Sequence, residues 1–576
     1  MSNPSSAGHA IVQALEAHGV DRVFQVPGES FLDVLDGLHD AAIDVVVCRQ
    51  EGGAAYAAEA DGKLTGRPGV AMVTRGPGAA NAMIGVHAAW QDGTPLVLFV
   101  GLVPMGSRQR ESFQDFDLRG WFGTTTKRVL VLDEPGRASE LVAEAFFAAR
   151  SGRPGPVVVG LPEDVIREPF HGTHVTPLPV AQGAVDAADL RELQALLSSA
   201  RQPLVVTGGN AWSATGAAAM TAWLERTGIP AITQWRANGV VPSDSPVFAG
   251  TLGYRRGDTV AAALDEADLV LAVGTVLGEI DTDGYTLRQR PDARTVIVST
   301  DPARTGHSGP VTRHILARPD VFAAALAELD VQPGPGWAAW RDRLRTAQER
   351  YTALPAAPHP AESAGSPASM TAVMRELVAH LPRDAIITGG AGNHSAWPQR
   401  YLPIRSYPAL LSPRNGSMGY SIPAALAAGL RYPQRLVVTV AGDGEFMMNG
   451  NELATARQHG AAPLIVVMDN GQFGTIRAHQ EKWYPGRVSG TQLVNPDFAA
   501  LGEAMGAWSA RIERADQVTD AVKGALRAVQ DEQRPALLHV LVDPSVLRTE
   551  QEHSDDPEPT RRSSSRPTSS KAGFDA

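Results

Sequence analysis

Several features that mark secreted, membrane or nucleic-acid-binding proteins are missing from this sequence. A single cysteine, Cys48, excludes an internal disulfide framework and is compatible with a reducing compartment. The net charge of −11 leaves no basic surplus for nucleic acid. No apolar run could span a bilayer, and the N-terminus MSNPSSAGHA lacks a basic and then apolar signal pattern. We therefore expect a cytoplasmic protein that binds neither membranes nor nucleic acid.

The length and the local sequence pattern predict several α/β units. With 576 residues the chain exceeds the usual reach of one hydrophobic core. Helix-like and strand-like segments alternate, which is typical of doubly wound parallel sheets with helices on both faces. The predicted domains are 1–175, 185–345 and 368–546, followed by a polar tail, 547–576, that we expect to be disordered. The predicted strands are 22–26, 45–48, 69–74, 95–100 and 156–160, then 203–206, 269–272 and 295–298, then 385–387, 436–440 and 464–468.

The stretch 441–475 contains the clearest candidate site. The apolar run 436–440 ends at Gly442, Asp443 and Gly444, and a helix is expected to begin near Asn451. A strand that runs into a glycine turn and then a helix leaves backbone N–H groups free to bind phosphate oxygens. Glycine and aspartate also form ordinary turns, so this triplet alone is weak support for a site.

A second apolar run, 464–468, ends in Asp469, Asn470, Gly471 and Gln472. Neighbouring parallel strands would bring their carboxyl ends together, where open α/β sheets bind ligands. Asp443, the Asn470 amide oxygen and a carbonyl near Gln472 could then bind one Mg²⁺ together with two diphosphate oxygens, because Mg²⁺ prefers six oxygen ligands.

This arrangement of Gly-Asp-Gly, a spacer of residues 445–468 and Asp-Asn resembles the thiamine diphosphate (ThDP) fingerprint, whose usual ending is Asn-Asn. On these motifs the chain resembles the ThDP-dependent 2-oxo acid enzymes, and most of all acetolactate synthase large-subunit-like proteins. The resemblance covers roughly residues 8–545. It implies a pyrimidine-binding domain, a middle domain and a diphosphate-binding domain, in that order.

The resemblance also implies a catalytic acid in the first unit. A strand-like segment ends and an alanine-rich helix begins at Glu51. By itself, this position suits a carboxylate that is stabilised by the helix dipole. In the family, the matching glutamate faces the aminopyrimidine ring and holds a proton next to the ring nitrogen.

Further positions match cofactor contacts of the family. Met418 matches a bulky apolar side chain that wedges beneath the cofactor, although such a methionine could equally be core packing. His394 could likewise be a simple core or surface histidine. The cofactor-binding positions that the resemblance implies are Val26, Pro27, Gly28, Gly76, Asn81, Asn393, His394, Gly416, Met418, Gly442, Gly444, Glu445, Gln472 and Phe473.

Three positions bear on the reaction and its substrate. Phe113 and Gln114 resemble an acetolactate synthase pattern in which the glutamine reaches the substrate, and the adjacent histidines of simple decarboxylases are missing here. Glu29 could protonate a carbanion, or it could cap the next helix. Gln480 stands where acetolactate synthases usually have a tryptophan that shapes acceptor choice. The acceptor is therefore expected to differ from pyruvate or 2-oxobutyrate.

The hypothesis is a ThDP- and Mg²⁺-dependent carboligase, which decarboxylates a small 2-oxo acid and transfers the acyl carbanion to a carbonyl acceptor. Because Glu51 and the diphosphate site belong to facing domains, the resemblance implies a homodimer or homotetramer with shared sites. Residues 276–280 lack the flavin-associated stretch, so FAD binding is doubtful. The alternatives are a non-carboligating decarboxylase or lyase that uses Glu29, and a non-catalytic ThDP-binding protein.

Overall fold

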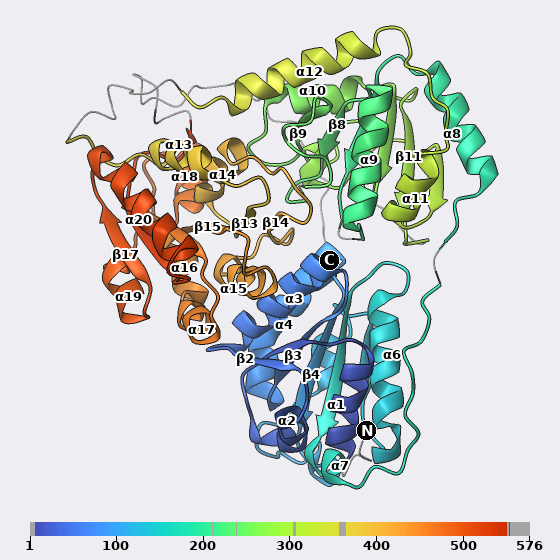
Figure 1. Cartoon of the computed structure of the whole chain (residues 1–576), viewed down its shortest axis with the longest axis vertical. Helices are drawn as coiled ribbons and strands as arrows, with labels where there is room; N and C mark the ends of the chain where they lie inside the picture. Colours follow the sequence, from blue (N-terminus) through green and yellow to red (C-terminus); the bar gives the residue numbers. More distant parts are fainter. Residues whose placement is uncertain are drawn as a thin grey trace, which may run out of the picture.

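The computed structural model describes residues 6–181, 183–209, 211–237, 239–302, 307–355, 365–549 and 552. It contains three six-stranded sheets in which every strand pair is parallel. Each sheet occupies one part of the chain, coloured blue, green and orange to red in Figure 1. The predicted fold class, three doubly wound α/β units, is confirmed.

The first sheet has the order β2-β1-β3-β4-β6-β5. Its central strands are fully buried apolar runs because helices cover both faces, as parallel sheets require. Helices α3 and α4 pack on one face, and α1 and α6 pack on the other. The strands are β1 (Arg22–Gln25), β2 (Asp44–Val47), β3 (Gly69–Val73), β4 (Leu96–Leu102), β5 (Arg128–Val131) and β6 (Pro156–Pro162). The helices are α1 (Ala7–Ala17), α2 (Leu32–His39), α3 (Glu51–Thr65), α4 (Arg75–Asp92), α5 (Leu118–Phe122), α6 (Ala138–Arg150) and α7 (Glu163–Arg167).

The middle sheet has the order β12-β11-β10-β7-β8-β9, which is the strand order of dinucleotide-binding folds. Its strands are β7 (Pro203–Thr207), β8 (Ala231–Thr233), β9 (Phe248–Thr251), β10 (Leu269–Val273), β11 (Arg294–Ser299) and β12 (Arg313–Leu316). Its helices are α8 (Ala187–Ser199), α9 (Ala214–Thr227), α10 (Asp258–Glu266), α11 (Pro319–Leu326) and α12 (Trp337–Thr352).

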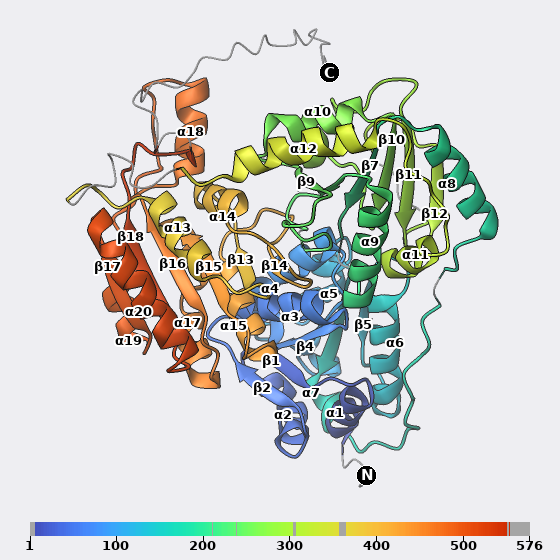
Figure 2. The same ribbon diagram turned by 45° about the horizontal axis from the view of Figure 1, so that its top comes forward.

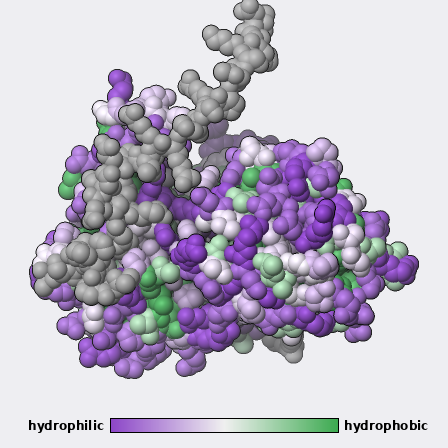
Figure 3. Space-filling view, turned by 90° about the horizontal axis from the view of Figure 1, so that it is seen from above, coloured by the Kyte–Doolittle hydropathy of each residue, from purple (hydrophilic) through white to green (hydrophobic). Residues whose placement is uncertain are grey.

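Figure 3 shows one face of the whole molecule, on which hydrophilic residues dominate and apolar residues form only small groups.

The third sheet, β14-β13-β15-β16-β18-β17, repeats the connectivity of the first. Its strands are β13 (Ile386–Gly389), β14 (Leu410–Leu411), β15 (Val437–Gly442), β16 (Leu464–Asp469), β17 (Trp508–Ile512) and β18 (Ala536–Leu541). Its helices are α13 (Met370–His380), α14 (Ala396–Tyr401), α15 (Ser421–Arg431), α16 (Asp443–Asn449), α17 (Glu452–His459), α18 (Gly474–Trp483), α19 (Phe498–Ala504) and α20 (Val518–Gln530).

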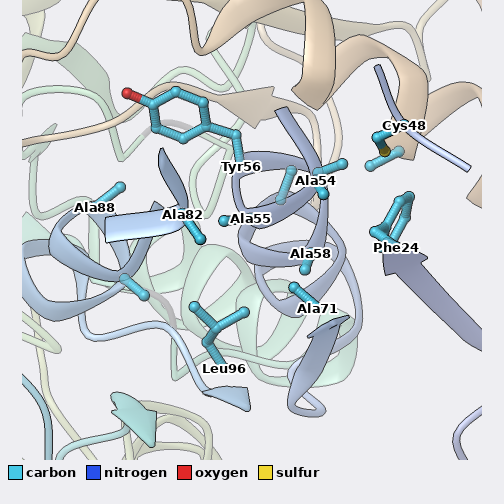
Figure 4. Close-up of a cluster of buried hydrophobic side chains, with 14 of the residues drawn as sticks. Phe24, Cys48, Ala54, Ala55, Tyr56, Ala58, Ala71, Ala82, Ala88 and Leu96 are labelled. Carbon is cyan, nitrogen blue, oxygen red and sulfur yellow. The ribbon is translucent and has the colours of Figure 1, made fainter. Parts of the chain in front are cut away.

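Helices α3, α4 and α15 join the first and third units through one shared core. Figure 4 shows the small side chains Ala54, Ala55 and Ala58 of α3 beside Ala82 and Ala88 of α4. The alanines of α15 belong to the same buried cluster. Such small residues let helices approach closely, so two units that are distant in sequence pack side by side (Figures 1 and 2).

The helix predicted near Asn451 is present as α17, which begins at Glu452, but the sequence did not predict α16, which begins at Asp443 directly after β15. One further prediction needs correction. The predicted tail was expected to be disordered from residue 547, yet Thr549 is buried and Glu552 accepts hydrogen bonds from the N–H groups of Met370 and Thr371 at the start of α13. Residues 553–576 lie outside the described part of the chain.

Candidate active site

A cavity of about 240 Å³ opens at the carboxyl ends of β15 and β16. These strands are parallel neighbours, as predicted, with Gly442 opposite Met468. Every predicted cofactor or metal position of the third unit lines this cavity: Asn393, His394, Gly416, Met418, Gly442, Asp443, Gly444, Glu445, Asn470, Gln472 and Phe473. Thr475 and Ile476, at the start of α18, also line it and were not predicted.

The turn between β15 and α16 requires glycine for steric reasons. A Cβ on Gly442 would lie 2.8 Å from His394 Nδ1, and one on Gly444 would lie 2.5 Å from Phe473 Cε1. No side chain caps the first turn of α16 from the N-cap position. The turn therefore presents backbone N–H groups close to the cavity, as an anion site requires.

Asp443 is the acidic group of this turn and is 3% exposed. Its Oδ1 accepts the Gly444 N–H at 2.9 Å, and its Oδ2 accepts an N–H of the Asn495 amide at 2.8 Å. Burial raises the pKa of Asp443 above its usual value. A buried carboxylate that has only neutral hydrogen-bond donors among its described partners is a suitable ligand for a bound metal ion.

Asn495 was missed by the sequence analysis. Its amide donates to Asp443 and, at 2.7 Å, to Oδ1 of Asp469. Asp469 Oδ2 in turn lies 2.9 Å from Nε2 of His539. Burial alone would raise the pKa of Asp469, but the hydrogen bonds from His539 and Asn495 outweigh it and lower the pKa. Asn495 lies in a loop without periodic pattern, so no sequence signal indicated its role.

The donors around the cavity fit a diphosphate and an oxygen-bound metal. Nδ2 of Asn393 is buried and has no hydrogen-bond partner among the described residues, while Oδ1 of the same side chain accepts from Thr475 at 2.9 Å. The described chain contains no cluster of three His, Cys, Asp or Glu side chains that could hold a metal. A metal here would instead use Asp443 with amide and carbonyl oxygens near Asn470 and Gln472, a set that suits Mg²⁺.

A buried carboxylate and a half-buried guanidinium stabilise the walls of the cavity. Oε2 of Glu445 lies 2.7 Å from His394 Nε2, and Ser421 donates to the other oxygen of Glu445 at 2.8 Å. Arg236 of the middle unit stacks on Trp235 and donates to the carbonyls of Gly390, at 2.6 Å, and Pro413. Burial lowers the pKa of Arg236 to about 10. The middle unit therefore supports both loops that flank the cavity.

Glu51 and Asn81 meet in the first unit. Glu51 is the first residue of α3, and its Oε2 accepts an N–H from Asn81 at 2.9 Å. Its carboxylate is half-buried. No residue of the first unit lines the cavity of the third unit, so one chain does not bring Glu51 to the diphosphate site.

The remaining predicted positions of the first unit surround neighbouring turns. The turn Val26, Pro27 and Gly28 packs against Thr74, and the N–H of Gly76 donates to the carbonyl of Gln114 at 3.1 Å. Gln114 has a left-handed backbone (φ 64°), and its Oε1 is buried without a partner in the described chain. Phe113 is 76% exposed. A strained polar residue beside an exposed aromatic one suits a surface that another molecule covers.

Two predicted side chains differ from expectation. Glu29 caps no helix, because neither of the helical segments that follow has a side-chain cap. Its carboxylate instead lies 3.1 Å from the guanidinium of Arg75, which also binds Glu163 at 2.7 Å. Gln480 does not line the cavity, and its amide holds Ser489 through two backbone hydrogen bonds. Helical geometry explains this, since Gln480 lies more than a turn beyond Ile476.

The carboxyl ends of β7 and β10 in the middle unit close on each other. Trp212 donates to the carbonyl of Gly208 at 2.9 Å, and a Cβ on Gly274 would overlap that same carbonyl. The cavity beside them is about 50 Å³.

Comparison with known proteins gives a consistent result along the chain. Residues 5–120, 190–326 and 390–540 match the models for the N-terminal, central and C-terminal domains of thiamine pyrophosphate enzymes. The acetolactate synthase large subunit of Parasynechococcus marenigrum is 33% identical over 87% of this chain and 82% of its own length. The acetolactate synthase isozyme 2 large subunit of Escherichia coli is 31% identical over 92% of this chain and 95% of its own length. The described helices include none that is both long and apolar enough to cross a membrane.

Proposed function

We propose that this chain, which belongs to the thiamine pyrophosphate enzyme family, is a carboligase of the acetolactate synthase type. The family and the relatives make it a ThDP-dependent enzyme. The proposed reaction decarboxylates a small 2-oxo acid and transfers the acyl carbanion equivalent to an aldehyde or 2-oxo acid. The observation that carries the proposal is the convergence of the predicted positions of the third unit on one cavity, where the buried Nδ2 of Asn393 has no hydrogen-bond partner among the described residues.

The residues of this cavity would hold the cofactor at its diphosphate end. Asp443, the Asn470 amide oxygen and a carbonyl at Gln472 would bind Mg²⁺, and the Asn393 amide would donate to a diphosphate oxygen. When bound, the cofactor supplies the carbon nucleophile and electron sink for decarboxylation. The chain itself binds and orients, and Met418 offers an apolar wedge whose carbonyl accepts a hydrogen bond from Tyr56 at 3.4 Å.

Glu51 would hold the proton at the aminopyrimidine end, with Asn81 orienting its carboxylate. Because Glu51 does not line the cavity of its own chain, we propose that a second copy supplies it. The enzyme would then be a homodimer or a dimer of dimers with shared sites. The proposal includes no flavin, because residues 276–280 lack the flavin-associated stretch.

Carboligation is favoured over simple decarboxylation by two observations. The carboxylate of Glu29, the alternative proton donor, is in an ion pair with the buried Arg75 guanidinium. The side-chain oxygen Oε1 of Gln114 is buried without a hydrogen-bond partner in the described part of the chain, and it could bind substrate.

Product analysis by NMR and mass spectrometry tests the reaction. Purified protein is incubated with ThDP, Mg²⁺ and a panel of 2-oxo acids, with and without aldehyde acceptors. We expect CO₂ and a condensed 2-hydroxy ketone or acid from wild type, and no product from Glu51→Gln. Free aldehyde as the sole product would contradict carboligation and indicate a decarboxylase.

Subunit complementation tests the shared site. Glu51→Gln and Asp443→Asn are each expected to be inactive, but a heterodimer contains one site with both wild-type residues. Random mixing should restore about a quarter of wild-type activity, since half the dimers are mixed and each has one intact site of two. No restoration, with mixed dimers confirmed by mass spectrometry, would place both residues in a site within one chain.

A further inference from the structure

The carboxylate of Glu452 lies at the junction that leads into Glu51, although it belongs to the other unit. Glu452 starts α17 in the third unit and is fully buried. Its Oε1 accepts the backbone N–H groups of Arg49 and Gln50 at 3.0 and 3.1 Å. Its Oε2 accepts the hydroxyl of Thr455 at 2.6 Å. Both backbone donors immediately precede Glu51, the first residue of α3. The Glu452 carboxylate therefore fixes the backbone from which the Glu51 side chain projects.

The two units fit each other closely at this point. Gln50 is the N-cap of α3, and its own side chain accepts the Gly53 N–H. The backbone N–H groups of Arg49 and Gln50 lie just outside the helix, so their acceptor is the Glu452 carboxylate and not a carbonyl of α3. A Cβ on Gly53 would overlap Oε1 of Glu452, so glycine at that helical position makes room for the carboxylate.

Other residues of α17 hold the same junction. Nε2 of His459 accepts the Val47 N–H at 3.1 Å, and the Gln458 side chain accepts from Arg49 Nη2 at 2.6 Å. The Gln458 contact is exposed, whereas Glu452 is buried. The end of β2 and the start of α3 are therefore held by α17 as well as by their own sheet.

The same segment also carries the proposed metal ligand. Helix α16 begins with Asp443, and α17 begins nine residues later with Glu452. One short segment thus connects the diphosphate half-site of a chain to the residues that carry Glu51 in the same chain.

We propose that Glu452 is a positioning residue that fixes the orientation of Glu51. This inference rests on the proposed function, in which Glu51 exchanges a proton with the cofactor. In a dimer with shared sites, Glu51 of one chain acts in the site whose diphosphate half belongs to the other chain. Glu452 would therefore connect the diphosphate half of one site with the pyrimidine half of the second site.

The test measures two properties of the full-length protein separately. One is the rate at which the C2 proton of bound ThDP exchanges with D₂O, followed by quenched-flow NMR. The other is the Kd for ThDP in the presence of Mg²⁺, measured by calorimetry. Glu452→Gln should slow the exchange about tenfold and leave the Kd within about threefold, because misplacing a proton-transfer group affects the rate rather than diphosphate binding.

Two further variants keep the test independent of folding defects at position 452. Gly53→Ala displaces the Glu452 carboxylate without changing it, and alanine is a better helix former than glycine. It should slow exchange to a similar degree as Glu452→Gln. The matched control is Gln458→Ala, which removes only the exposed contact with Arg49 and should keep the wild-type exchange rate.

The outcomes separate this inference from the proposed function. Glu51→Gln should slow exchange at least about a hundredfold. If Glu51→Gln exchanges at the wild-type rate, the assigned role of Glu51 is wrong and this inference falls with it. If Glu51→Gln is slow but Glu452→Gln and Gly53→Ala exchange normally, only the positioning role is overturned. An equal loss of ThDP affinity in Glu452→Gln would also overturn it, since a general structural role would then explain the result.

Discussion

The first and third sheets have the same strand order, but the turns that follow their third strands carry side chains of opposite charge. The third strand of each sheet leads into a helix, β3 into α4 and β15 into α16. In the first sheet that turn contains Arg75, whose buried guanidinium binds Glu29 and Glu163. In the third sheet it contains Asp443, which has no ion-pair partner among the described residues.

This difference shows how one topology serves two purposes. The strand order places a turn at the edge where ligands bind, but the charges of that turn decide what it can bind. The turn of the first sheet is neutralised by its own neighbours. The turn of the third sheet has a buried carboxylate with no ion-pair partner among the described residues, which suits the cation that we propose it binds. Helices α3 and α15, which correspond in the two units, pack against each other and join them.

The largest expected effect comes from removing the charge that distinguishes the third turn. Asp443→Asn should weaken ThDP binding in Mg²⁺ at least about a hundredfold, or about 2.7 kcal/mol, and abolish turnover. Calorimetry measures the affinity. The matched control is Asp469→Asn, which should cost about tenfold or less because Asp469 faces His539. Equal losses in both variants would contradict the assignment of Asp443 as the ligand.

The next effect concerns the first unit. Glu51→Gln should lower kcat by about 10² to 10⁴, with ThDP affinity changed only a few fold, because proton transfer rather than diphosphate binding is lost. Steady-state kinetics and calorimetry check the two parts. Asn81→Ala, which removes only the hydrogen bond to Glu51, should have a smaller effect. A large loss of ThDP affinity in Glu51→Gln would contradict the assignment of proton transfer to the first unit and of diphosphate binding to the third unit.

A third prediction addresses the contact between the units. Lys63 of α3 is buried between Glu59 and Asp92, and it also donates to the carbonyl of Ser412 in the third unit. Lys63→Met would leave two buried carboxylates without a cation, so it should lower the free energy of unfolding by about 3–5 kcal/mol. Urea denaturation measures this loss. The control Lys523→Met, at an exposed site, should stay within about 0.5 kcal/mol of wild type.

The smallest expected effect is a pH dependence at the same contact. Burial raises the pKa of Glu59 above its ordinary 4.5, although Lys63 opposes the shift. The folded state therefore holds this proton more tightly, so the contribution to stability is largest below pH 4.5 and declines as the pH rises through the folded pKa. Glu59→Gln removes that dependence, so its Tm should vary less than that of wild type between about pH 5 and 8. Parallel Tm curves would contradict a titrating Glu59.

Most strands that the sequence predicted lie in the middle of a sheet, and the exception is the edge strand β2. Runs such as 69–74 and 464–468 are apolar throughout because both faces of a parallel strand are covered, and the structure has β3 and β16 there. The edge strands β5, β9, β12, β14 and β17 were not predicted, because an edge strand has fewer neighbours and a weaker apolar signal. The inner strands β8 and β18 were also missed: β8 has only three residues, and the apolar run of β18 is interrupted by His539, which binds Asp469.

By itself, the sequence determined the α/β class and the strand and turn that place Asp443, because these depend on local runs and turns. The order of the three units and most positions around the cavity were expected from the family resemblance instead. Tertiary structure alone decided which side chains those positions meet. Asn495 reaches Asp443 from a loop, Arg236 supports the cavity from the middle unit, and Glu452 holds the turn of Glu51. Such contacts join residues far apart in the chain, and no local pattern encodes them, because they arise only when separately folded surfaces pack together.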